Sequence, residues 1–123
     1  MKYITLTVLL SCFVVITACS QRQMLMFDKN PLVANEQTIA QGKILFLEHC
    51  QQCHGTSGKG DEPLAKTLPE KPADLTDLPL FPQGFIEFAI TTGGDTEYMP
   101  EWRKILTKEQ IQQVGIYLHT IQR

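Results

Sequence analysis

The sequence predicts an all-α domain of three to four helices joined by long loops. Three stretches, near residues 38–50, 83–92 and 107–121, carry apolar residues at the three- and four-residue steps typical of helices. Prolines punctuate the region between the first two stretches and exclude a long helix or a central strand there. We find no segment with the alternating pattern of a strand. The length of 123 residues is that of one domain.

The N-terminal end has the pattern of an export signal. A positively charged start precedes an uncharged, mostly apolar run over residues 4–17, which fits a secretory signal better than a membrane span. The sequence Ile-Thr-Ala-Cys at residues 16–19 resembles the lipobox of bacterial lipoproteins, which implies cleavage before Cys19 and lipid on that cysteine. Residues 1–18 are therefore expected to be a signal peptide and residues 19–37 a lipidated tether to a membrane, inner or outer. A plain signal peptide or an uncleaved anchor is the alternative.

Charge and cysteine content narrow the possible partners. The formal net charge is −2, from 11 basic and 13 acidic residues, and there is no basic run. These features argue against nucleic acid as a partner. If Cys12 leaves with the signal and Cys19 is acylated, Cys50 and Cys53 are the thiols that remain, so no disulfide framework is expected.

The first helix is expected to begin near Thr38, which forms a capping box with Gln41. Gly42 lowers helix propensity by roughly 1 kcal/mol relative to alanine. We interpret this glycine as the point where another helix crosses closely. That partner is expected to be the last helix, where Thr107 and Gln110 form a second capping box. The apolar stripe of the last helix consists of Ile111, Val114, Leu118 and Ile121, with Tyr117 beside it.

The first helix leads into Cys50-Gln51-Gln52-Cys53-His54, the C-x-x-C-H pattern of covalent c-type haem attachment. The two thiols add across the haem vinyl groups, and the adjoining imidazole reaches the iron through Nε2. A thioredoxin-like redox pair and a structural zinc site are the alternatives. The first needs a βαβ context and the second needs further Cys or His ligands, and neither is apparent.

The loop after this motif contains Gly55, Gly58 and Gly60, which allow tight turns against a large flat ligand. A short middle helix is expected from Gln83 to Thr92, stopped by the following pair of glycines. Few apolar side chains are spread over so much loop, which predicts a thin core. A buried haem would supply the missing apolar bulk.

Met99 lies in a loop downstream of His54 and precedes a proline, where a second axial ligand is expected. A soft thioether stabilises ferrous iron and raises the reduction potential. Met99 as core filler is the alternative. Trp102 is expected to pack near Met99, and His49 to be a solvated helix position.

Together these features resemble the class I cytochromes c, small monohaem electron-transfer proteins, over the range Thr38 to Arg123. The resemblance implies N- and C-terminal helices that cross and a chain that wraps one haem c. It also implies that a backbone carbonyl accepts the Nδ1 proton of the haem-binding histidine, with Pro63 as our candidate. It is carried by Gly42, Phe46, the Cys50–His54 motif, the Gly55–Asp61 loop, Met99-Pro100, Val114 and Tyr117.

The function predicted from these residues is that of a one-electron carrier, without catalytic residues or a small-molecule substrate. Cys50 and Cys53 would attach the haem, and His54 and Met99 would bind its iron. Such a protein would work outside the cytoplasm, on the periplasmic side, between redox protein partners. One alternative is a fixed subunit of a larger dehydrogenase or oxidase complex. Another is a haem sensor or peroxidase in which the Met99 ligand is labile.

Overall fold

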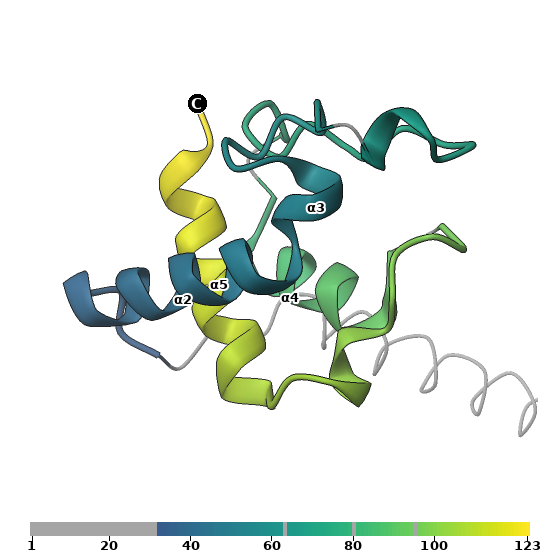
Figure 1. Cartoon of the computed structure of the whole chain (residues 1–123). Helices are drawn as coiled ribbons and strands as arrows, with labels where there is room; N and C mark the ends of the chain where they lie inside the picture. The colour runs from purple at the N-terminus through teal and green to yellow at the C-terminus, as the bar shows by residue number, and fades with distance from the viewer. Residues whose placement is uncertain (1–31, 63, 80, 95) are drawn as a thin grey trace, which may run out of the picture.

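The computed structural model describes residues 32–62, 64–79, 81–94 and 96–123, which form a helical domain (Figure 1). This part of the chain contains no β-strand, so the predicted all-α class is confirmed. Among its helices, none is both long and apolar enough to cross a membrane. The expected signal peptide, Cys19 and most of the expected tether lie outside the described residues. The helices are α2 (Glu36–His49), α3 (Gln51–His54), α4 (Gln83–Thr92) and α5 (Lys108–Ile121), with short 3-10 turns η1 (Leu64–Lys66) and η2 (Trp102–Lys104).

Helix α2 begins at Glu36, with Asn35 as its N-cap. The Asn35 side chain accepts a hydrogen bond from the Thr38 N–H at 3.0 Å, and the Asn35 N–H donates to Thr38 Oγ1 at 3.0 Å. The prediction that Thr38 caps the helix is therefore wrong, because Thr38 is the third helical residue of a capping box that starts at Asn35. Asparagine is the stronger N-cap of the two residue types, and the helix gains nearly a turn by using it.

Helices α2 and α5 cross at Gly42, as the sequence predicts (Figure 1). A Cβ atom added to Gly42 would collide with the Gln113 carbonyl oxygen, and it would lie 2.9 Å from Tyr117 Cβ. Next to this contact, the Phe46 and Tyr117 rings lie 5.4 Å apart between centroids. The glycine is thus needed because the two backbones touch there.

The ends of the other two long helices also match the sequence analysis. Thr107 caps α5: its N–H donates to Gln110 Oε1 at 2.8 Å, and its hydroxyl accepts from the Gln110 N–H at 3.2 Å. Helix α4 ends at Gly93, which has a left-handed backbone (φ 85°) and donates its N–H to the Ala89 carbonyl. A residue with a Cβ is strained in this conformation, so a glycine stops the helix well.

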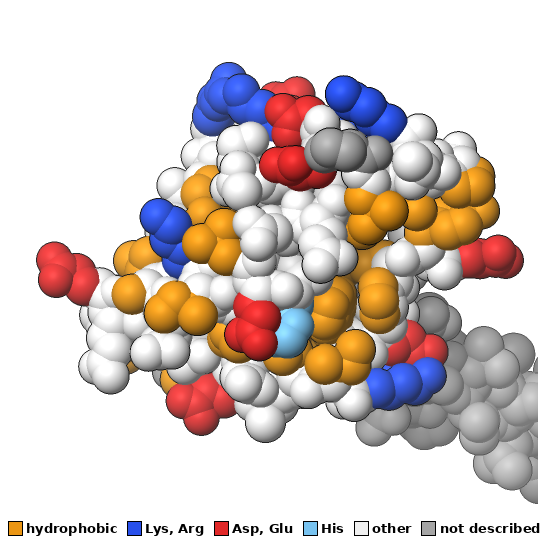
Figure 2. All heavy atoms as spheres, viewed as in Figure 1, with side chains coloured by type: hydrophobic (Ala, Val, Ile, Leu, Met, Phe, Trp, Pro, Cys, Tyr) orange, Lys and Arg blue, Asp and Glu red, His pale blue; other side chains and the backbone are white. Residues whose placement is uncertain are grey.

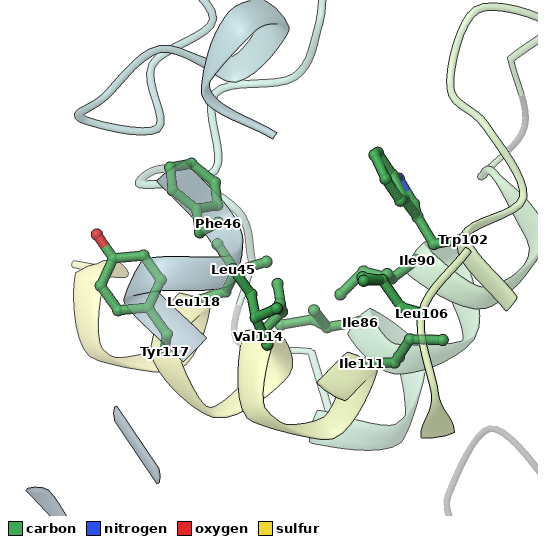
Figure 3. Packing of buried hydrophobic residues seen from close by; sticks show 10 residues of the cluster. All are labelled: Leu45, Phe46, Ile86, Ile90, Trp102, Leu106, Ile111, Val114, Tyr117 and Leu118. Atoms are coloured by element: carbon green, nitrogen blue, oxygen red, sulfur yellow. The ribbon is translucent and has the colours of Figure 1, made fainter. Parts of the chain in front are cut away.

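The core lies where α2, α4, α5 and η2 meet (Figure 3). Phe46 and Val114 are almost completely buried, at 0% and 1% exposure, and both come from the crossing helices. Trp102, from η2, extends this cluster beyond the three helices. Its members are Leu45, Phe46, Ile86, Ile90, Trp102, Leu106, Ile111, Val114, Tyr117 and Leu118.

The glycine-rich turn after α3 packs against residues 72–77, which we call the 72–77 segment. Gly58 accepts a hydrogen bond from the Leu75 N–H at 2.7 Å. A Cβ on Gly60 would lie 2.6 Å from the Pro72 carbonyl oxygen. These glycines were expected to turn against a flat ligand, but in the described part of the chain they do not line the cavity discussed below. They allow instead a close approach of two loop backbones.

Candidate functional site

A cavity of about 560 Å³ lies between α2, α3, α4, α5 and the loops that follow α3 and α4. Its volume falls within the range of pockets that hold small cofactors. Hydrophobic side chains gather beside α3 and α4 on the face shown in Figure 2, and charged side chains lie mostly around the margin. Apolar walls of this kind favour a large, flat, apolar group. The apolar lining includes Phe46, Leu68, Leu75, Leu78, Phe81, Phe85, Ile86, Ile90, Trp102, Val114 and Leu118.

One helical turn brings the residues of the C-x-x-C-H motif to this cavity. Cys50 accepts hydrogen bonds at its carbonyl from the Cys53 N–H at 3.2 Å and the His54 N–H at 2.9 Å. This turn, α3, lets Cys50, Cys53 and His54 all line the cavity, although they are spread over five positions. Both cysteines are free thiols. The arrangement fits two thioether bonds and one axial ligand to a single group.

The ring of His54 is held by the 72–77 segment. Its Nδ1 lies 3.2 Å from the Ala73 carbonyl oxygen, which is a hydrogen-bond acceptor, so Nδ1 carries the proton and Nε2 keeps its lone pair. Burial lowers the pKa of His54, while this hydrogen bond opposes the shift. A neutral imidazole with a free Nε2 is the form that binds a metal. Pro63, our candidate for the acceptor, lies outside the described residues, and the carbonyl found here belongs to Ala73.

Burial, followed by repulsion from Cys53, raises the pKa of the Cys50 thiol to about 12. In the closed fold this thiol is therefore protonated at neutral pH. Since the thiolate is the nucleophilic form, Cys50 is poorly reactive once the cavity has formed. Such a buried, unreactive thiol fits a cysteine that is already attached to a bound group better than it fits one thiol of a redox-active pair. The described residues also contain no cluster of three or more His, Cys, Asp or Glu side chains that could hold a metal ion. In that part of the chain the zinc alternative thus lacks a ligand set.

Met99 lines the same cavity as His54. Its loop folds back over the glycines that end α4: a Cβ on Gly94 would lie 3.9 Å from Met99 Sδ, and one on Gly93 would lie 2.5 Å from the Met99 carbonyl oxygen. The four residues predicted from the sequence as haem attachments and ligands therefore meet at one cavity. These residues could hold a covalently attached porphyrin in this cavity.

We expect the substitution Gly93→Ala to loosen the Met99 loop. An alanine there is strained at φ 85° and pushes against the Met99 carbonyl. The two effects should cost about 1–3 kcal/mol of stability. In haem-loaded ferric protein, the weak absorbance band that reports iron–methionine bonding should diminish. Gly94→Ala is a matched control, because Gly94 also has a positive φ (63°) but an added Cβ would meet Met99 only at 3.9 Å. An equal loss of this band in both variants would contradict the expectation.

Sequence reasoning missed a second histidine at the cavity. His49 was expected to be a solvated helix position, yet it lines the cavity, and its ring centroid lies 5.5 Å from that of Trp102. Trp102 is 8% exposed and also lines the cavity, as does Met99. Its packing near Met99 stays a prediction. The one signal in the sequence is the position of His49 directly before Cys50, at the end of the helix that delivers the motif. No pattern in the sequence predicts that Leu68, Leu78 and Phe81 line the cavity, because they come from an irregular loop.

Comparisons with known proteins identify the family of this chain. The model of the family "Cytochrome C oxidase, cbb3-type, subunit III" matches residues 37–118. Among curated proteins, the chain is 29% identical over 85 residues to the Cbb3-type cytochrome c oxidase subunit FixP of Bradyrhizobium diazoefficiens. That match covers 67% of this chain and 27% of the relative.

A solved structure from Kuenenia stuttgartiensis, a reducing HAO-like protein complex, is also similar. It has a TM-score of 0.67 and 30% sequence identity, and the match covers 76% of this chain and 47% of that chain. The chain thus spans less than half of each of these relatives. Because the family model matches more than half of the chain, the chain belongs to the cytochrome c family of cbb3-type oxidase subunit III.

Proposed function

We propose that this protein is a one-electron carrier with a single haem c. Cys50 and Cys53 would attach the haem, and His54 Nε2 and Met99 Sδ would bind its iron. One observation carries the proposal: a single apolar cavity is lined by both thiols, an imidazole whose Nδ1 is already engaged, and a thioether. The haem, when bound, supplies an iron that alternates between the ferrous and ferric states.

The chain itself contributes position and environment. The Ala73 carbonyl fixes the tautomer of His54 and raises the basicity of its Nε2. The thioether of Met99 favours the ferrous state. Apolar walls exclude water, so that little solvent has to reorganise when the charge changes. With His54 and Met99 as ligands, the iron would have no position open for a substrate, and we assign no catalytic residue.

The proposal extends to export and anchoring. We infer that residues 1–18 are removed, that Cys19 carries lipid, and that the domain works on the periplasmic side of a membrane between an electron donor and an acceptor. The lipobox-like sequence at residues 16–19 supports this part. A lipid with several acyl chains would be enough for stable anchoring.

A single preparation tests these proposals. Protein purified from membranes should be red, show a six-coordinate low-spin spectrum, and titrate as a one-electron couple. Its intact mass should equal that of residues 19–123 plus one haem and acyl chains. Colourless protein with both central thiols open to alkylation would refute the haem proposal. A haem-loaded chain without acyl chains would refute the anchoring proposal alone.

A second candidate function is that of a fixed subunit of a larger oxidase or dehydrogenase complex. It is favoured by the family match, whose description names an oxidase subunit, and by the similar chain from a protein complex. Size-exclusion chromatography of detergent extracts from native membranes distinguishes the two functions. Elution with larger subunits favours the fixed subunit, and elution at the mass of the single chain favours the carrier.

A further inference from the structure

The hydrogen bond between His54 and Ala73 depends on a segment that has no regular secondary structure. The 72–77 segment lies far along the chain from α3, and a loop carbonyl can hold an imidazole only if the loop itself is held. Three sets of contacts do this. The Leu75 N–H donates to the Gly58 carbonyl at 2.7 Å, and the Arg123 N–H donates to the Thr76 carbonyl at 3.1 Å. The third set lies within the segment.

Within the segment, one carboxylate oxygen accepts two hydrogen bonds. Asp74 Oδ1 accepts from the Thr76 N–H at 2.9 Å and from the Thr76 hydroxyl at 2.7 Å. This Asx turn closes the backbone directly after Ala73 and fixes the direction of the peptide that carries the Ala73 carbonyl. Thr76 is only 6% exposed, so its hydroxyl is in a fixed place.

The acceptor in this turn is a charged group. Hydrogen bonds to a carboxylate are shorter and about twice as strong as those between neutral groups. The two Thr76 donors, assisted by the charges of Lys59 and Arg123, hold the pKa of Asp74 below its ordinary value. Asp74 is therefore ionised at neutral pH, and charge-assisted hydrogen bonds hold the turn.

We propose that Asp74 and Thr76 are positioning residues for the axial histidine: their turn holds the Ala73 carbonyl on His54 Nδ1 and so sets the basicity and orientation of the imidazole. This inference rests on the proposed function, because it concerns His54 as an iron ligand. Neither side chain lines the cavity, so the pair acts through the backbone of the segment. A weaker Nδ1 hydrogen bond makes the imidazole less basic, which favours the ferrous state.

The test measures the reduction potential of haem-loaded variants. Thr76→Val removes the hydroxyl at nearly constant shape and unchanged charge, and Thr76→Ser restores it. We expect Thr76→Val to raise the ferrous-to-ferric ratio at a fixed ambient potential about fivefold, the order of one net hydrogen bond. Thr76→Ser should stay close to wild type. Asp74→Ala, which removes both hydrogen bonds, should have a larger effect than Thr76→Val.

The variant Asp77→Asn is the control for the loss of one negative charge, since Asp77 is an exposed acid in the same segment. Asp74→Asn removes the same charge but also weakens the turn, so its shift should exceed that of Asp77→Asn. The ¹H NMR shifts of the haem methyl groups in the ferric protein report the orientation of the imidazole plane. They should move in Thr76→Val and Asp74→Asn and not in Asp77→Asn.

Equal potentials and methyl shifts in Thr76→Val, Asp74→Asn and Asp77→Asn would overturn the inference. If Asp74→Ala fails to accumulate, the potentials and methyl shifts of Thr76→Val and Asp74→Asn test the inference. Failure of the proposed function has a different signature, because wild-type protein would then lack a low-spin haem spectrum before any variant is compared.

Discussion

Replacing Met99 with alanine should leave the haem covalently bound but lower its reduction potential on the order of 0.1 V or more, within the roughly 0.8 V range that axial ligands set. The thioether favours ferrous iron, so its loss stabilises the ferric state. Cys53 lies on α3 and Cys50 is its N-cap, away from the Met99 loop in sequence, so both thiols should keep the haem attached. The open position should bind carbon monoxide rapidly in the ferrous state. Redox titration and carbon monoxide binding measure the two effects.

Met24→Ala and Met26→Ala are the controls for this experiment, because they remove the other two methionines of the expected mature chain. Neither should change the spectrum. An unchanged spectrum and potential in Met99→Ala would show that Met99 is not the ligand. Rapid carbon monoxide binding by the wild-type protein would instead favour the sensor or peroxidase alternative, in which this ligand is labile.

Substituting alanine for Gly42 should destabilise the domain, although alanine is the better helix former. The gain in helix propensity is about 1 kcal/mol. The added Cβ would collide with the Gln113 carbonyl and come within 2.9 Å of Tyr117 Cβ. A backbone cannot move aside as a flexible side chain can, so α2 and α5 must separate. We expect a net loss of about 2 kcal/mol or more, seen as a fall in Tm of roughly 10 °C by circular dichroism.

The neighbouring substitution Gln41→Ala serves as the control for helix propensity. Gln41 lies in the same turn of α2 but is exposed. Its replacement should leave Tm unchanged or raise it slightly, since alanine is a strong helix former. If Gly42→Ala were as stable as Gln41→Ala, the close approach of the two backbones would not exist in solution.

Local sequence patterns predicted most of the helical framework. The range Gln83–Thr92, the capping box of α5 and the crossing at Gly42 all depend on signals that lie within a few residues or require a glycine. The start of α2 was misplaced because two acceptable N-caps, Asn35 and Thr38, stand three residues apart. Asn35 is used because asparagine is the stronger N-cap and because a start there lengthens the helix by nearly a turn.

The residues that complete the site were harder to predict. His54 and the Ala73 carbonyl are 19 positions apart, and no local pattern signals a contact between an imidazole and a distant loop carbonyl. The prolines near residues 69–82 exclude a long helix or a central strand in this loop. They do not predict that the loop forms a wall of the cavity. His49 lines the cavity beside Trp102, which lies far along the chain. Such long-range contacts follow from the tertiary fold and not from periodicity.

The crossing of α2 and α5 has a consequence for the order of assembly. Cys50 and Cys53 precede α5 in the chain by more than 50 residues, and α5 supplies Val114 and Leu118 to the cavity wall. Until α5 docks on Gly42, the nascent pocket is open on that side, and the Cys50 thiol is not yet shielded from water. We therefore expect the Cys50 thiol to be more reactive before α5 docks than in the closed fold.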